Sequence, residues 1–165
     1  MRNIVYIVEG ETEQRLIETL KTDLICIRAG KIIKHNVIQD LVRKNKFMKY
    51  NAGTLFVLVF DTDTDGAAIL RENVRIISCM PNAAGVILIP QVKNLEDELC
   101  YSCDIRDIRT LTGSKTIKDF KRDLLNISNL GTKLKAVGFS ISRLWARIPS
   151  GEFEGIENNS ARIKL

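Results

Sequence analysis

The stretch Thr54-Leu55-Phe56-Val57-Leu58-Val59-Phe60, followed at once by Asp61-Thr62-Asp63-Thr64-Asp65-Gly66, decides the fold of this chain. A continuous apolar run without polar alternation is typical of a strand buried on both faces of a parallel sheet. Residues 67–78 then have helical spacing, and residues 85–90 predict a second buried strand. Strands that alternate with helices predict an α/β fold in which crossover helices flank a parallel sheet.

The rest of the chain extends this pattern on both sides. Residues 4–8 form a short apolar run, and the residues after it have apolar positions at helical spacing. We expect a short second strand within residues 25–34 and a helix beginning in residues 37–42. After Pro90 the expected elements are helices at 94–103, at 115–126 and, with a weaker pattern, at 140–147, followed by a loop-like segment at 149–165.

The length and composition indicate one compact domain. The chain has 165 residues, of which 45% are hydrophobic, enough for a real core. We divide it into an α/β core over residues 1–103 and a mainly helical extension over residues 104–165 of the same domain. No apolar run approaches the roughly 18 residues of a membrane span, and no signal-peptide pattern follows the start, so we expect a cytoplasmic protein without a membrane partner.

The charge of the chain favours one class of partner, and the spacing of its cysteines bears on a possible zinc site. The net charge of +5 favours a polyanionic partner, and the basic residues gather in residues 31–49 and 115–135. We expect nucleic acid to contact Lys44, Lys46 and Lys118, although solvated helix faces would account for any one of these lysines. Cys100 and Cys103 form a C-x-x-C pair without a second pair at zinc spacing, which favours reduced thiols in a helix over a zinc site.

Two acidic clusters begin where expected strands end. One is Glu9-Gly10-Glu11-Thr12-Glu13, and the other starts at Asp61. Adjacent parallel strands lie about 4.8 Å apart, so carboxylates at their ends can converge on one cation. Without a cation they would repel, and Mg²⁺ suits them because it takes oxygen ligands and shares its coordination sphere with phosphates. We therefore expect Glu9, Asp61 and Asp63 to hold Mg²⁺.

Three other interpretations of these acids are open. The dipole of a following helix would stabilise Glu11 and Glu13 without any ion. Turns and helix caps would account for the acids after Asp61. The second cluster, completed by Glu72, also satisfies the calcium-loop pattern D-x-[DN]-x-[DN]-G-x5-E, but an EF-hand needs a helix before the loop and a strand is expected there.

The acidic motifs resemble those of the TOPRIM family. Val8-Glu9-Gly10-Glu11-Thr12-Glu13 is similar to the V-E-G-x-T-E motif of OLD-like and RloB-like TOPRIM proteins of bacterial defence systems, and Val59-Phe60-Asp61-Thr62-Asp63 is similar to the D-x-D motif of the family. The resemblance covers about residues 3–100. It implies a TOPRIM-like, Rossmann-like parallel sheet with flanking helices.

The resemblance also implies roles for individual residues. Glu9 would be a metal ligand or general acid/base, Asp61 and Asp63 would be ligands, and Glu13 would be a ligand at a second metal. Further acids are expected after the next strand, where Glu96 and Glu98 are the candidates. A catalytic lysine near the scissile phosphate is also expected, with Lys115 preferred over Lys93 and Lys118.

The implied activity is hydrolysis of a nucleic-acid phosphodiester with Mg²⁺, for which Mn²⁺ would substitute. OLD-family nucleases carry an ATPase on the same chain, but G-x-x-x-x-G-K-[ST] does not occur in this sequence, so an ATPase or sensor would be a separate partner. A standalone endonuclease of antiphage defence is therefore the leading expectation. The alternatives are a catalytically inactive module that binds nucleic acid and a nuclease of RNA maturation.

Overall fold

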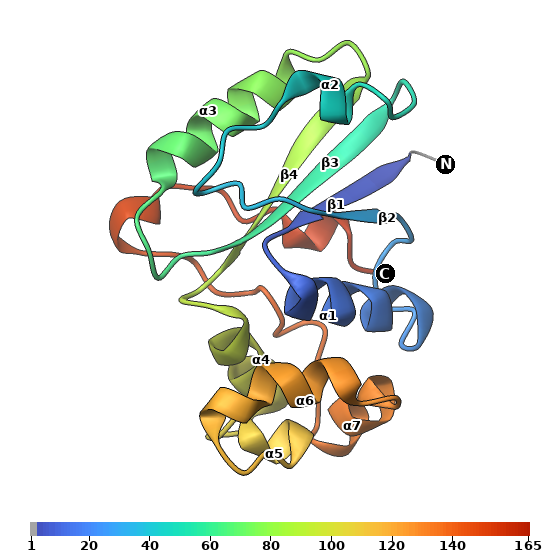
Figure 1. Ribbon diagram of the computed structural model, residues 1–165, viewed down its shortest axis with the longest axis vertical. Coiled ribbons are helices and arrows are strands. Elements are labelled where there is room, and N and C mark those ends of the chain that lie inside the picture. The colour runs from blue at the N-terminus through green and yellow to red at the C-terminus, as the bar shows by residue number, and fades with distance from the viewer. Residues whose placement is uncertain (1–2) are drawn as a thin grey trace.

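The computed structural model describes residues 3–165, and a four-stranded parallel sheet forms its centre (Figure 1). The strand order is β2-β1-β3-β4, so β3, which carries Asp61, is an interior strand. The α/β class and the parallel sheet predicted from the sequence are confirmed. The strands are β1 (Ile4–Val8), β2 (Lys31–Lys34), β3 (Thr54–Asp61) and β4 (Ala83–Gln91).

Helices cover both faces of the sheet. Successive side chains of a strand point to opposite faces, so Tyr6 and Val57 belong to one core cluster while Val5 and Phe56 belong to the other. The first face packs against α1 (Glu11–Thr22), and the second packs against α3 (Ala67–Ser78) and the short helix α2 (Lys44–Phe47). This double cover explains why the sheet strands are apolar runs without polar alternation.

The helices that follow β4 extend the α1 side of the molecule (Figure 1). Phe120 and Leu134 are fully buried and belong to the same core cluster as Leu16 of α1. Residues 104–165 are therefore packed on the α/β core through this cluster and also, at Phe153, through the cluster on the other face of the sheet. The helices are α4 (Leu95–Cys103), α5 (Arg109–Thr112), α6 (Phe120–Asn126) and α7 (Leu130–Ala136), with single 3₁₀ turns at Ile117–Asp119, Gly151–Phe153 and Ser160–Arg162.

The helix expected to begin in residues 37–42 is absent, and a turn takes its place. The side chain of Asn73, on α3, explains the difference. Its amide donates to the carbonyls of Val37 and Asp40 at 2.8 Å and accepts from the backbone N–H of Val42 at 2.8 Å. A buried side chain on another element thus satisfies the backbone groups that a helix would have paired.

The C-terminal expectations also need correction. Residues 140–147 form turns and not a helix, because Trp145 adopts a positive φ of 54° that interrupts helical geometry. Residues 149–165 are not a free loop. Asn159 donates to the carbonyl of Leu88 at 2.8 Å, and Ile27 pairs with Lys164 as an antiparallel bridge. Within residues 3–165, no helix is long and apolar enough to cross a membrane.

Candidate functional site

Glu9 and Asp61 lie together at the carboxyl edge of the sheet. Glu9 follows the last residue of β1, Asp61 ends β3, and these two strands are hydrogen-bonded neighbours. Oε1 of Glu9 accepts a hydrogen bond of 3.2 Å from the backbone N–H of Asp61. The two acidic motifs, 52 residues apart in the sequence, therefore meet at one point of the fold as predicted.

A buried amide fixes the orientation of the Asp61 carboxylate. Gln91 ends β4 and lies opposite Asp61 in the strand register, and its Nε2 donates to Oδ1 of Asp61 at 2.6 Å. Oε1 of Gln91 in turn accepts from the indole Nε1 of Trp145 at 3.3 Å. Both Gln91 and Trp145 are buried. The sequence analysis missed this chain, although a glutamine that ends a buried strand beside the D-x-D strand is a signal that could have revealed it.

The third carboxylate of the edge belongs to Glu13. It lies in the first turn of α1, is only 6% exposed, and accepts a hydrogen bond of 3.1 Å from the Thr12 hydroxyl. Glu9, Glu13 and Asp61 line one depression of about 400 Å³. The other residues that line it are Gly10, Glu11, Thr12, Asn36, Lys121 and Leu125.

The packing of these acids changes their protonation. Burial raises the pKa of Asp61 to about 8, and the neighbouring charges of Glu9, Glu13 and Asp63 add to the rise against the hydrogen bond from Gln91. Burial also raises the pKa of Glu9, with the Asp61 backbone N–H opposing the effect. Without a cation, Asp61 is therefore largely protonated at neutral pH, and a cation bound there would displace its proton.

Asp63 lies beyond the end of β3 and is exposed. Its Oδ2 accepts from the Asn94 side chain at 3.2 Å, and its charge reaches Glu9 and Asp61. In the part of the chain that the structure describes, no three His, Cys, Asp or Glu side chains are close enough together to hold a metal ion. Glu9, Asp61 and Asp63 were expected to converge on one ion, but they only share one edge of the sheet. Hydrogen bonds from the side-chain amides of Gln91 and Asn94 turn Asp61 and Asp63 toward those two residues.

The structure removes two competing interpretations of the second acidic cluster. α3 begins after Gly66 without a cap from its preceding acids, and Glu152 instead accepts from the N–H groups of Gly66 and Ala67 at 3.3 and 3.1 Å. Asp63 therefore does not cap this helix. The calcium-loop pattern also fails, because β3 precedes the loop and Glu72 pairs with Arg75 at 2.6 Å.

Glu98 does not fit the ligand role expected for it. Its side chain is 0% exposed, and its Oε1 accepts from the Val92 backbone and from Arg147 at 2.9 and 3.0 Å. Its Oε2 accepts from the backbone N–H of Trp145 at 3.0 Å. A carboxylate whose two oxygens are occupied inside the core supports the fold, so we withdraw Glu98 from the metal ligands.

Glu96, the other candidate metal ligand on α4, lies beside a different lysine from the catalytic lysine that was expected. Its Oε1 lies 3.5 Å from Nζ of Lys121, and Lys121 is the lysine that lines the acidic depression. Lys115 and Lys118 are exposed and do not line it, and Lys93 pairs with Asp97. Lys121 therefore replaces Lys115 as the lysine at the acidic edge. Its position depends on which face of α6 packs inward, which sequence spacing left undecided.

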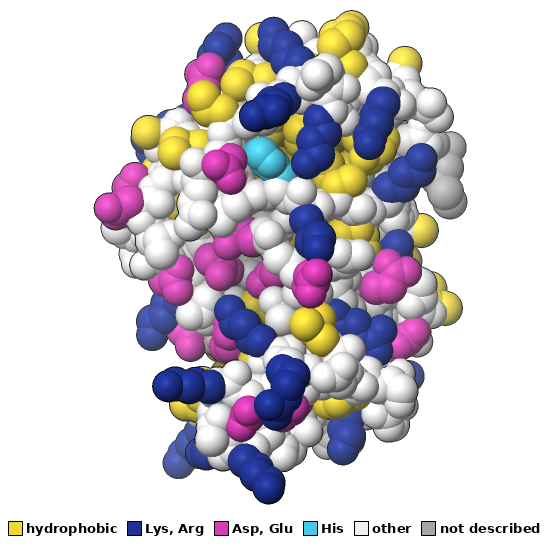
Figure 2. Space-filling model, in the orientation of Figure 1, with side chains coloured by type: hydrophobic (Ala, Val, Ile, Leu, Met, Phe, Trp, Pro, Cys, Tyr) yellow, Lys and Arg dark blue, Asp and Glu magenta, His cyan; other side chains and the backbone are white. Residues whose placement is uncertain are grey.

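The basic residues of 31–49 form a surface of their own. Lys44 and Lys46 lie on α2, are exposed, and do not line the acidic depression. Figure 2 shows many Lys and Arg side chains over the α2 and β2 part of this face, while acidic side chains group across its middle. The basic surface and the acidic edge are therefore separate parts of this face.

Comparison of the chain with protein-family models, with curated proteins and with solved structures found no match, so the function must be inferred from the site itself.

Proposed function

We propose that this chain is a Mg²⁺-dependent nuclease of TOPRIM type that hydrolyses a phosphodiester bond of a nucleic acid. One observation carries the proposal: Asp61 is half-buried beside Glu9 and Glu13 in an open depression that Lys121 also lines. Carboxylates held together in this way oppose folding unless they serve a cation or a proton transfer.

The residues of the edge suit Mg²⁺ in their chemistry. Carboxylate oxygens are the hard ligands that Mg²⁺ takes, and Mn²⁺ accepts the same set. The hydrogen bonds from Gln91 and Asn94 use one oxygen each of Asp61 and Asp63 and leave the second oxygen of each carboxylate. The fit to Mg²⁺ therefore concerns the type of donor atom and the shared edge of the sheet.

Each residue has a defined task in this proposal. When bound, Mg²⁺ would supply charge stabilisation on the phosphate and a lowered pKa of water. Glu9 can accept a proton from an attacking water, because burial raises its pKa above the ordinary value. Gln91 orients Asp61, and the ammonium group of Lys121 can neutralise charge that develops on the phosphate.

The biological setting is part of the same proposal and is supported by the motif resemblance alone. It comprises endonucleolytic cutting, a role in antiphage defence and a separate ATPase or sensor partner. The second candidate is a nucleic-acid-binding module without activity. Within residues 3–165 no three His, Cys, Asp or Glu side chains lie close enough together to hold a metal ion, which favours that candidate.

Cleavage of circular substrates tests the proposal. Circular single-stranded DNA, plasmid and a structured RNA are incubated with Mg²⁺, with Mn²⁺ or with EDTA, since a circle can be opened only by an endonuclease. We expect metal-dependent cleavage by the wild type and its loss in Glu9→Gln and Asp61→Asn. Glu154→Gln is the matched control, because it removes one exposed carboxylate outside the depression. Binding without cleavage under every metal condition would favour the inactive module.

A further inference from the structure

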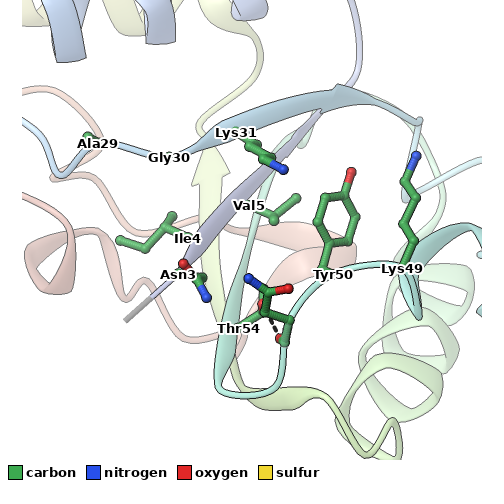
Figure 3. Close-up of a pocket in the computed structure, with 10 residues that line it drawn as sticks. Asn3, Ile4, Val5, Ala29, Gly30, Lys31, Lys49, Tyr50 and Thr54 are labelled. Carbon is green, nitrogen blue, oxygen red and sulfur yellow. Dashed lines mark hydrogen bonds between the residues drawn. The ribbon is translucent and has the colours of Figure 1, made fainter. Parts of the chain in front are cut away.

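A second depression lies at the opposite, amino-terminal end of the sheet (Figure 3). It has a volume of about 320 Å³ and lies where β1, β2 and β3 begin. Basic and neutral polar groups supply its polar lining. The lining residues are Asn3, Ile4, Val5, Ala29, Gly30, Lys31, Lys49, Tyr50, Asn51 and Thr54.

Three residues with hydrogen-bond donors in their side chains, Lys31, Lys49 and Tyr50, line this depression. Nζ of Lys31 lies 5.9 Å from the centroid of the Tyr50 ring, and Nζ of Lys49 lies 5.5 Å from the same centroid. Figure 3 shows the Tyr50 side chain between the two lysines, with its hydroxyl toward the same side as their amino groups. Two ammonium groups beside one phenol hydroxyl form a donor set for the oxygens of an anion.

The fold holds these donors in place. The Tyr50 ring packs edge-on against Phe56 with centroids 6.0 Å apart, and the Tyr50 carbonyl accepts from the buried side chain of Asn82 at 3.0 Å. Lys31 begins β2 and is in register with Val5 of β1. Burial raises the pKa of Tyr50, which keeps its hydroxyl a donor at neutral pH.

The charges of the depression are not balanced by the protein. Among residues 3–165, neither Lys31 nor Lys49 has a carboxylate within 4 Å. Lys21 and Lys34, also near β2, each pair with a glutamate at 2.9 Å. An anion bound beside the Tyr50 hydroxyl would bring a compensating charge close to both lysines.

We infer that Lys31, Lys49 and Tyr50 form a binding site for a phosphate group, carried either by a single nucleic-acid strand or by a small phosphorylated ligand. The site differs from the acidic edge, because Thr54 and Asp61 at the two ends of β3 are about 23 Å apart at the rise of an extended strand. It goes beyond the proposed hydrolysis, and it requires neither metal nor catalysis.

Binding measurements in EDTA test this inference separately from any cleavage. The probes are pyrophosphate, followed by the amide shifts of residues 31, 49 and 50 in NMR, and a labelled oligodeoxythymidine, followed by anisotropy. The variants are Lys31→Gln/Lys49→Gln and Tyr50→Phe, which keeps the ring packing. The charge-matched control is Lys133→Gln/Lys135→Gln, which removes two exposed lysines of α7.

We expect the two site variants to bind about tenfold more weakly. The salt slope of oligonucleotide binding should fall by about 0.7 in the double lysine variant, the value for one phosphate of a single strand. If the site variants bind only the oligonucleotide more weakly, a nucleic-acid strand carries the phosphate. If they bind only pyrophosphate more weakly, a small ligand carries it. Absence of binding by the wild type, equal loss in the control, or unchanged binding by Tyr50→Phe would overturn the inference.

Discussion

Gln91 donates a 2.6 Å hydrogen bond to Oδ1 of Asp61 across the register of β4 and β3. The same amide accepts from the indole of Trp145, so one buried side chain connects the acidic edge to the C-terminal segment. A ligand that pulls Asp61 away from Gln91 would therefore change the environment of the indole.

Trp145 is the sole tryptophan of the sequence, so its emission should report on the acidic edge. Titration with Mg²⁺ should give a saturable change in Trp145 fluorescence in the wild type, because a metal on the free Asp61 oxygen draws electron density from the oxygen that accepts from Gln91. Asp61→Asn should remove this change, and the control Glu154→Gln should keep it. A response of equal size in Asp61→Asn would contradict the connection.

Asp61→Asn should also change the pH dependence of stability. The folded pKa of Asp61 is about 8 against an ordinary value of 3.8, so the folded state holds this proton more tightly than the unfolded chain. The contribution of Asp61 to the free energy of unfolding is fully present below the pKa of this group in the unfolded chain. It decreases as the pH rises toward 8, by up to about 1.4 kcal/mol per pH unit. In thermal melts in EDTA, the melting temperature of Asp61→Asn should therefore rise relative to that of the wild type as the pH is raised from acidic to mildly alkaline.

Magnesium should reverse the order of the two melting temperatures at mildly alkaline pH. Metal binds only the folded state, so it should raise the melting temperature of the wild type more than that of the variant. If Asp61→Asn melts lower at every pH and neither protein responds to metal, Asp61 serves the fold and not an ion.

Glu98→Gln should destabilise the fold and leave metal binding unchanged. The substitution leaves Arg147 without its partner and places an amide donor among groups that already donate. Breaking a buried pair costs about 3–5 kcal/mol, and the partial exposure of Arg147 lowers our expectation to about 2–4 kcal/mol. Urea denaturation measures the loss of stability, with Glu96→Gln, at a partly exposed carboxylate of the same helix, as the control. A loss below that of Glu96→Gln would refute the structural role.

A pair of lysine variants decides which lysine serves the proposed chemistry. Lys121→Gln should lower the rate of cleavage about a hundredfold, while substrate binding and the melting temperature change little, because its charge acts at the phosphate. Lys115→Gln removes a comparable exposed charge in a loop outside the depression and should cleave at the wild-type rate. Single-turnover cleavage compares the two. Slower cleavage by Lys115→Gln than by Lys121→Gln would instead identify Lys115 as the lysine that acts at the phosphate.

Local sequence patterns predicted the strands and helices that are marked by the apolar or acidic pattern of their own residues. The apolar runs located β3 and β4, helical spacing located α3, and the acids at the strand ends located Glu9 and Asp61 at one edge. These features depend on neighbours within a few residues of the same strand or helix.

Features that depend on distant contacts were not predicted. Glu96 and Glu98 are two residues apart on α4, and only the packing of that helix decides that one faces Lys121 while the other is buried against Arg147. The turn at residues 37–42 likewise depends on Asn73, more than thirty residues later in the chain. Sequence spacing gives the period of a helix, but the rest of the fold chooses which face is buried.

The connection from Trp145 to Gln91 also sets an order of events in folding. It joins residues 54 apart, and the contact from Glu152 to the start of α3 joins residues 85 apart. Closing the intervening loops costs entropy that packing elsewhere must offset. During synthesis, β1 and β3 would emerge well before Trp145 and Glu152. The hydrogen bonds that connect Asp61 to Trp145 through Gln91 can therefore form only once the C-terminal segment has been synthesised, after the strands that bring Glu9 and Asp61 together.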